Sequence, residues 1–392
     1  RSDDLTFRPV FLCNAPDGSM VIADFCEEFI AHGQNYQGQI DPSSGRIYRL
    51  LGKGLALTSD NNLEAKTSAE LVRALDAPNL WHRQTAARLL GQRADRTVLP
   101  ELLATMRTAA PHPALDALWA IHQMDELDEG TALEALRHPS PIVRAWVIRL
   151  MGDACRLPGG FFESLVALAR TESDPEVRCQ ILSTAMRLRA EQSIPLIAAT
   201  TPPQGQGAAD LADPFIPLMT WFALERHCAD DSERVLALFE DPSFWTHDVV
   251  EQHVLPRIIR RFAEAGSRSD YLRCARLLRL APSPQSREIL LAGFDKAFEG
   301  RIPPAFPEEL TAELGGGSLS MQIRQGDRDA ITEGLALLGD PAAEIPQRLL
   351  AVHAFGTSAQ AEALQPLLKL ATAPSESDQA LQQAALSATQ IY

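Results

Sequence analysis

The sequence predicts a mainly α-helical protein, a solenoid of stacked helix pairs preceded by a short β segment. Two observations support this fold class. A helix start made of a turn, a proline and an arginine recurs along the chain, and 34 residues separate Arg144 from Arg178 in two of its copies. A repeat period in the thirties with paired helices is typical of a solenoid. Strand-like alternation is confined to the first part of the chain. A non-repetitive helical bundle is the alternative.

The β segment covers residues 1–57. Phe11-Leu12-Cys13 ends a first strand, and Ser19–Phe25 and Gly45–Leu50 read as the second and third. Pro16-Asp17-Gly18 predicts a tight turn between the first two, because proline presets φ and glycine tolerates φ > 0. Three strands alone leave two open edges and an apolar face. We therefore expect these strands to belong to a larger sheet, and otherwise to pack on the first helices or be locally unstable.

A polar linker at 58–67 precedes the helical repeats. The repeated unit is clearest at Asp76–Gly91, where Pro78 can open a helix and Gly91 can end it. Copies follow His138-Pro139, Asp174-Pro175 and Asp340-Pro341, and the Pro-x-Val-Arg start resembles the second helix of a HEAT repeat. The predicted segments are repeats at 68–199, a break at 200–213, repeats at 214–300, a flexible break at 301–317 and C-terminal repeats at 318–392.

Composition excludes several functions. The net charge of −15 argues against general nucleic-acid binding and against an anionic membrane surface. We expect the arginines of the repeat starts to pair with aspartates of adjacent turns. Without an apolar run of about 18 residues, no membrane span is predicted. No CxxC motif or common zinc spacing occurs. Cys155, Cys179, Cys228 and Cys274 are predicted to be small core residues, and Trp146 is predicted to be buried between repeats.

Five motifs of the N-terminal segment carry a resemblance to a known family: Phe7-Arg8-Pro9-Val10, Pro16-Asp17-Gly18, Ala23-Asp24-Phe25, His32-Gly33 and Gly45–Arg49. Together they resemble the last β-propeller blade of the membrane-bound dehydrogenase family, which is similar to sorbosone and glucose dehydrogenases. In that family HEAT-like repeats follow the blade, and Leu80–Ala86 and Pro217–Glu225 are similar to segments of its repeat region. The second strand departs from the family, which has Asp-Trp-Tyr where this chain has Asp24-Phe25-Cys26.

The resemblance implies a longer parent protein in the periplasm or cell envelope, with pyrroloquinoline quinone and calcium as its cofactors. This chain would bind neither cofactor itself. It lacks the CxxCH haem motif with which the family often ends, and most of the propeller. Because the chain begins at Arg1, we expect that its N-terminus was cut from something longer.

Asp24, His32 and Arg46 are the candidate site residues, because they lie at strand ends or in the long loop, where propellers gather substrate and cofactor groups. His32 would act as a base near neutral pH. The structural alternative is that Asp24 caps the loop and pairs with Arg46. Two functions follow. The first is a non-catalytic repeat scaffold whose partner is a protein or its own propeller domain. The second is a fragment of a quinone-dependent sugar or alcohol dehydrogenase.

Overall fold

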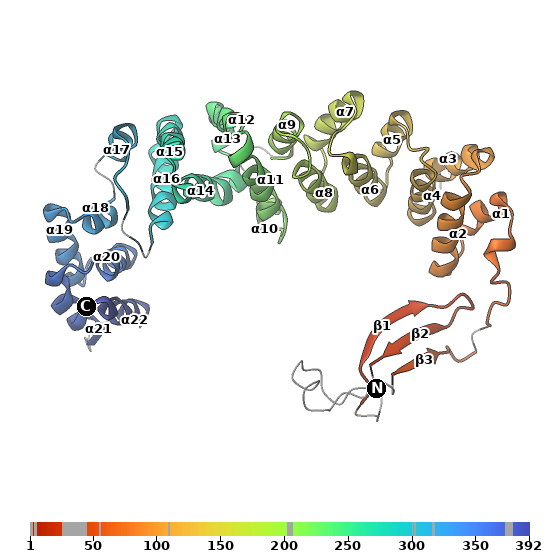
Figure 1. The fold of residues 1–392 in the computed structure, drawn as a ribbon, viewed down its shortest axis with the longest axis horizontal. Helices are drawn as coiled ribbons and strands as arrows, with labels where there is room; N and C mark the ends of the chain where they lie inside the picture. Colours follow the sequence, from red (N-terminus) through yellow and green to blue (C-terminus); the bar gives the residue numbers. More distant parts are fainter. Residues whose placement is uncertain are drawn as a thin grey trace. The chain divides into compact units, whose positions relative to one another are not determined.

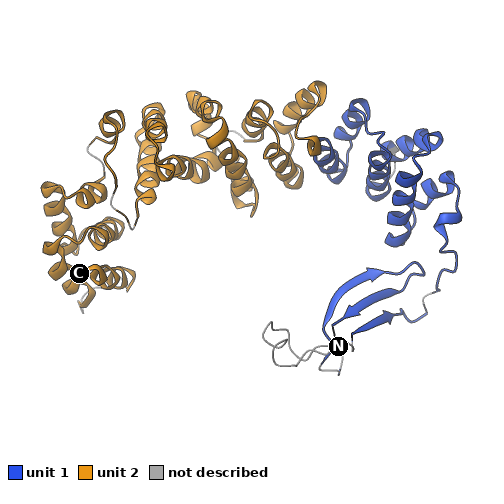
Figure 2. Cartoon of the chain, viewed as in Figure 1, with its two compact units in different colours: residues 1–151 blue, residues 152–392 orange. Residues whose placement is uncertain are grey.

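The structure is a computed structural model that describes residues 3, 6–25, 45–54, 56–108, 110–201, 207–299, 301, 303–315, 318–372 and 379–392. The chain forms two compact units, residues 1–151 and residues 152–392 (Figure 2).

Unit 1 opens with an antiparallel sheet of three strands in the order β1-β2-β3: β1 (Pro9–Asn14), β2 (Met20–Asp24) and β3 (Arg46–Leu50). The turn between β1 and β2 is closed by a hydrogen bond from Ala15 N to Ser19 O at 2.8 Å, and Gly18 has a φ of 92°. Only glycine adopts this conformation without steric cost. The three predicted strands and the Pro16–Gly18 turn are confirmed.

The rest of unit 1 is helical. Its elements are η2 (Leu63–Ala65), α1 (Ser68–Ala74), α2 (Leu80–Arg93), η3 (Arg96–Val98), α3 (Leu99–Thr108), α4 (Pro111–Gln123), α5 (Glu129–Leu136) and α6 (Pro141–Met151). α1 packs on α2, α3 on α4 and α5 on α6, while α2, α4 and α6 pack on one another in sequence. This pattern of paired helices with a continuous second row is that of a solenoid.

The ends of α2 differ from the prediction. α2 begins at Leu80 rather than at Pro78, because the Asn79 side chain caps it by accepting a hydrogen bond from Trp81 N at 2.9 Å. It also continues through Gly91 to Arg93 and ends at Ala94 in the left-handed conformation. Gly91 serves packing instead, since a Cβ at that position would lie 2.5 Å from Gln123 Cβ on α4. The prediction that Gly91 ends the helix was therefore wrong.

Unit 2 continues the array. Its elements are η4 (Gly152–Ala154), α7 (Gly159–Ala169), α8 (Pro175–Ala185), α9 (Ala190–Thr200), α10 (Ala208–Ala212), α11 (Ile216–Asp230), α12 (Ser232–Ala237), η5 (Leu238–Glu240), α13 (Pro242–Trp245), the π-helical η6 (Val250–Val254), α14 (Leu255–Ala265), α15 (Arg268–Leu280), α16 (Pro284–Ala297), α17 (Glu308–Leu314), α18 (Leu319–Gln325), α19 (Arg328–Gly339), α20 (Ile345–Ser358), η7 (Ala361–Ala363), α21 (Leu364–Thr372), α22 (Gln379–Ala388) and η8 (Thr389–Ile391).

Two rows of helices run through most of unit 2. α8, α11, α14 and α16 pack in sequence along one row, and α7, α9 and α12 along the other (Figure 1). Each helix contacts near neighbours in the chain, which confirms the mainly α, solenoid-like fold class. α10 and α17 lie within the segments 200–213 and 301–317, which the sequence predicted as breaks. The C-terminal helices share a separate apolar core around Phe355.

Candidate interaction surface of the N-terminal sheet

Both faces of the sheet carry exposed apolar side chains. Phe11, Ala23 and Ile47 form one cross-strand row, and Phe11 is 63% and Ile47 79% exposed. Since neighbouring residues of a strand point to opposite faces, Leu12, at 56% exposed, lies on the other face. In the described part of the chain, β1 and β3 each pair only with β2, so each presents one edge without a partner strand.

The sheet is attached to the helices at its turn. The Asn79 side chain donates to Ala15 O at 2.9 Å, and the His82 ring lies 2.8 Å from Pro16 O. The carbonyl groups of Ala15 and Pro16 therefore contact the N-terminal end of α2. Ser19, which follows the turn, is buried. Beyond the turn β1 and most of β3 remain exposed, while β2 between them is half-buried. The alternative in which their apolar face packs on the first helices was therefore wrong for this structure.

The candidate site residues lie at the opposite end of the strands. Asp24 and Arg46 are paired in register across β2 and β3. Asp24 is buried, and its Oδ1 accepts a hydrogen bond from Arg8 N at 2.5 Å, while its buried Oδ2 has no hydrogen-bond partner among the described residues. Arg46 donates to the Tyr48 hydroxyl at 3.0 Å. His32 lies outside the described residues. The structure therefore brings two of the three candidates together at one strand end.

Sequence reasoning missed a polar cluster at the turn. Asp17 accepts hydrogen bonds from Ser19 N at 2.9 Å and from Ser19 Oγ at 2.6 Å, and it pairs with Arg49 of β3. The Ser19 hydroxyl, followed by its backbone N–H, holds the pKa of Asp17 below its ordinary value. An Asp two residues before a Ser in a Pro-Asp-Gly turn is the signal that predicts such a bond. The cluster ties the third strand to the hairpin.

The repeat arginines have structural roles. Arg83 on α2 donates to Asp116 Oδ2 on α4 at 3.0 Å, and Arg178 on α8 pairs with Asp210 on α10. Burial raises the pKa of both aspartates, although each arginine opposes that shift. Arg144 of α6 donates to His138 O at 2.9 Å. The predicted pairing with aspartates of adjacent turns is confirmed for Arg83 and Arg178.

The core predictions for cysteine were half right. Cys228 and Cys274 are buried, whereas Cys155 is exposed and Cys179 is half-buried. Cys155 follows η4 with a φ of 56°, in a turn rather than in a helix. A turn places its side chains at the surface, so the helical pattern assumed for this residue was wrong.

Trp146 is only partly buried. It packs edge-to-face on Trp119 of α4, with ring centroids 4.8 Å apart, and the Arg149 guanidinium lies over its ring. The prediction that Trp146 is buried between repeats was wrong, because the ring packs against Trp119 of α4 and remains partly exposed. Trp221 and Trp245 in unit 2 are buried core residues.

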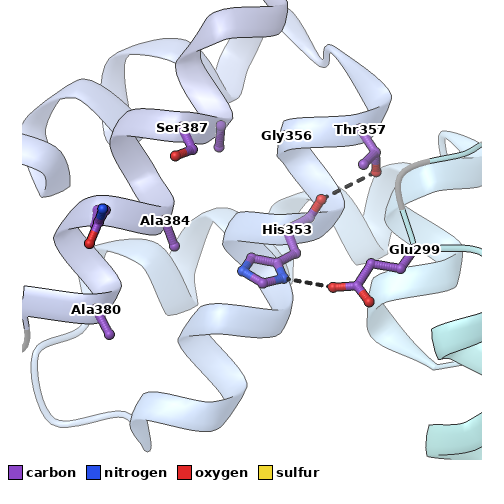
Figure 3. A pocket seen from close by; sticks show the side chains of 9 residues that line it. Glu299, His353, Gly356, Thr357, Ala380, Ala384 and Ser387 are labelled. Carbon is purple, nitrogen blue, oxygen red and sulfur yellow. Dashed lines mark hydrogen bonds and ion pairs between the residues drawn. The ribbon is translucent and has the colours of Figure 1, made fainter. Parts of the chain in front are cut away.

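A pocket of about 570 Å³ in unit 2 lies beside α20 and α22 (Figure 3). His353 Nδ1 and Glu299 Oε1 face each other at 3.5 Å, and Ser387 lies on α22 away from the imidazole (Figure 3). Among the residues that line this pocket, no hydrogen bond joins His353 to Ser387. The serine hydroxyl and the imidazole are therefore not arranged as a nucleophile and its base. A Cβ on Gly356 would lie 2.8 Å from Ala388 Cβ. Small residues therefore shape this pocket by bringing the two helices together.

Within the described ranges, no group of three or more His, Cys, Asp and Glu side chains is placed to hold a metal ion. No helix in those ranges has the length and apolar character required to cross a bilayer.

Comparisons with known proteins find similarity to a sequence family and to solved structures. Residues 1–54 match the sequence model of a family described as a domain of unknown function, DUF7133. No curated protein matches the chain. A crystal structure titled as that of an engineered protein is similar at 15% sequence identity, over 82% of this chain and 97% of that chain, with a TM-score of 0.29. A TM-score this low carries no argument. The family match covers the sheet of unit 1.

Proposed function

We propose that the chain is a non-catalytic repeat scaffold whose N-terminal sheet is completed by further β structure, as in the last blade of a dehydrogenase-like propeller. The observation that carries this proposal is the exposure of Phe11, Leu12 and Ile47 on the two faces of a three-stranded sheet. Exposed apolar patches of this kind mark interaction surfaces in folded proteins. The open edges of β1 and β3 provide unpaired backbone groups for further strands.

The helical repeats support the scaffold role by their chemistry. Their most buried charged groups are engaged in contacts between successive helices, as in the pairs of Arg83 with Asp116 and Arg178 with Asp210. Groups used in this way hold the array in register and are not available to a substrate. The sheet would then connect a β domain to the helical repeats, and the partner would be the protein's own propeller or another protein.

Amide hydrogen exchange tests this proposal. Ser19–Phe25 should exchange fast in this chain, because segments with few buried contacts open at little free-energy cost. In a protein extended upstream the same amides should become protected, while buried amides of α4 such as Ala117 and Ala120 serve as the reference in both samples. Equal and strong protection of the strands in both would mean that the sheet is self-sufficient, and the proposal would be wrong.

The second candidate is a fragment of a dehydrogenase that uses pyrroloquinoline quinone and calcium, and the buried, unpartnered Oδ2 of Asp24 is the observation in its favour. The described residues do not fit the metal, since calcium takes six to eight oxygen ligands and no group of three or more His, Cys, Asp and Glu side chains among them is placed to hold a metal ion. We therefore derive no catalytic step through either cofactor. Calcium-dependent quinone binding by this chain, lost in Asp24→Asn, would favour this candidate.

A further inference from the structure

A second exposed apolar surface lies in unit 2, far along the chain from the sheet. Helices α8 and α11 pack side by side (Figure 1), and a groove of about 500 Å³ lies between the start of α8 and the start of α11. Cys179 of α8 and Met219 of α11 line it, together with Phe215, which precedes α11. A volume of this size is within the range of protein sites that hold organic groups.

The groove continues into an exposed apolar row on α11. Phe215 is 65%, Leu218 41% and Phe222 44% exposed. Their spacing of three and then four residues places them on one face of the helix. Two hydrogen bonds hold the start of the helix in place: Asp213 Oδ1 accepts from Phe215 N at 2.8 Å and from Ile216 N at 2.9 Å. The opposite face of α11, with Ala223 and Leu224, is buried in the core. The exposed row is therefore a second apolar face of the helix, distinct from the one in the core.

The rim of the groove is acidic. The carboxylates of Glu176 and Asp213 line it, and no lysine or arginine is among its described lining residues. The pKa of the Cys179 thiol is raised to about 11. Burial is the largest cause, and the negative charges of Asp213 and Asp210 add to it. At the far end of the row, Glu225 is already paired with Arg261 at 2.8 Å. Glu176 and Asp213 are therefore the charged side chains among the groove's described lining residues.

We propose that this surface docks a cationic amphipathic helix, with leucine-like side chains on the row and in the groove and a lysine or arginine beside Glu176 and Asp213. A helix satisfies its own backbone hydrogen bonds, whereas an extended peptide needs backbone partners that two packed helices do not offer. The row spans eight residues, from Phe215 to Phe222, which corresponds to a helical rise of about 10 Å or two turns. The proposal does not depend on the function assigned to the sheet.

Binding of designed peptides tests the proposal. The probes are a fluorescently labelled 18-residue peptide of leucine and lysine with an amphipathic helical pattern, a scrambled peptide of the same composition, and a twin with glutamate for lysine. Fluorescence anisotropy with the full chain at about 0.15 M salt, where long-range attraction is screened, measures the affinities. The patterned lysine peptide should bind at least about tenfold more tightly than the other two.

Three variants locate the site. Phe222→Ser and Glu176→Lys should each weaken binding of the patterned peptide by at least about tenfold, as expected for central contacts of an interface. Leu386→Ser, which removes an exposed leucine from α22 of the same unit, should leave the affinity unchanged. Equal binding of the patterned and scrambled peptides, an unchanged affinity in Phe222→Ser, or no binding at about 100 μM would each overturn the proposal.

Cysteine alkylation gives an independent measurement that needs no substitution. Saturating patterned peptide should slow the alkylation of half-buried Cys179, followed by mass spectrometry, and leave exposed Cys155 of the same unit unaffected. Unchanged alkylation of Cys179, or equal slowing at both cysteines, would show that the peptide does not occupy the groove. Either result leaves the exchange experiment on the sheet unaffected, so failures of the two proposals are distinguishable.

Discussion

Removing the carboxylate of Asp210 should destabilise unit 2 strongly. Arg178 and Asp210 are 7% and 8% exposed, and the guanidinium also donates to Thr200 O at 2.5 Å and to Glu172 O at 3.2 Å. Asp210→Ala leaves this cation buried without its counter-charge. Such losses cost about 3–5 kcal/mol of unfolding free energy.

The double variant Arg178→Met/Asp210→Ala separates charge from packing. It removes both charges and keeps an apolar side chain of similar length on α8. The remaining cost is that of two backbone carbonyls, Thr200 O and Glu172 O, that lose a donor, which we estimate at about 1–2 kcal/mol. The double variant should therefore be more stable than Asp210→Ala alone.

The control is the exposed pair of Arg226 and Asp230, whose side chains are 57% and 61% exposed. Asp230→Ala should change the unfolding free energy by less than about 0.5 kcal/mol. Because a solenoid can unfold in stages, urea unfolding should be combined with amide exchange at Ile181 and Leu182 of α8. The reasoning is refuted if Asp210→Ala costs no more than Asp230→Ala, or if the double variant is the least stable of the set.

Three further predictions follow from close packing, a buried histidine and the composition. Gly293→Ala should cost about 1–3 kcal/mol, because its Cβ would lie 2.4 Å from the Pro256 backbone oxygen, whereas Gly339→Ala meets no atom within 4 Å and should be neutral or stabilising. Equal unfolding midpoints for the two would contradict this. Burial lowers the pKa of His227, so the unfolded chain binds the extra proton. The free energy of unfolding should therefore fall as the pH drops through about 6.5, the pKa of histidine in the unfolded chain. The fall should be smaller in His227→Asn. An unchanged pH dependence in that variant would show that another group is responsible. Lastly, the isolated chain should show no haem absorbance and no dye-linked sugar or alcohol oxidation with added quinone and calcium, and measurable turnover would promote the enzyme candidate.

The repeats were predictable because their signals are local. Asp174 and Pro175 open α8 as predicted, with the Asp174 carboxylate accepting from Glu176 N at 3.0 Å and from Val177 N at 3.2 Å. Capping of this kind depends on a few consecutive residues. The turn Pro16–Gly18 belongs to the same class. The candidate site was less predictable, because Asp24 and Arg46 could be placed at strand ends while their contacts depend on the register of the sheet.

The sequence by itself determined the fold class, the three strands and the pairing role of the repeat arginines, since periodicity and turn chemistry act over short distances. Only the tertiary structure decided which side chains face solvent. Gly91 resembles a helix stop in the sequence, yet it lies inside α2 because Gln123 of another helix approaches it. Phe215 and Phe222 resemble core residues, yet they form an exposed row, because the core occupies the other face of α11. The exposure of a side chain depends on the neighbours that it acquires on folding. The apolar pattern of one helix does not show which other helices will cover its faces.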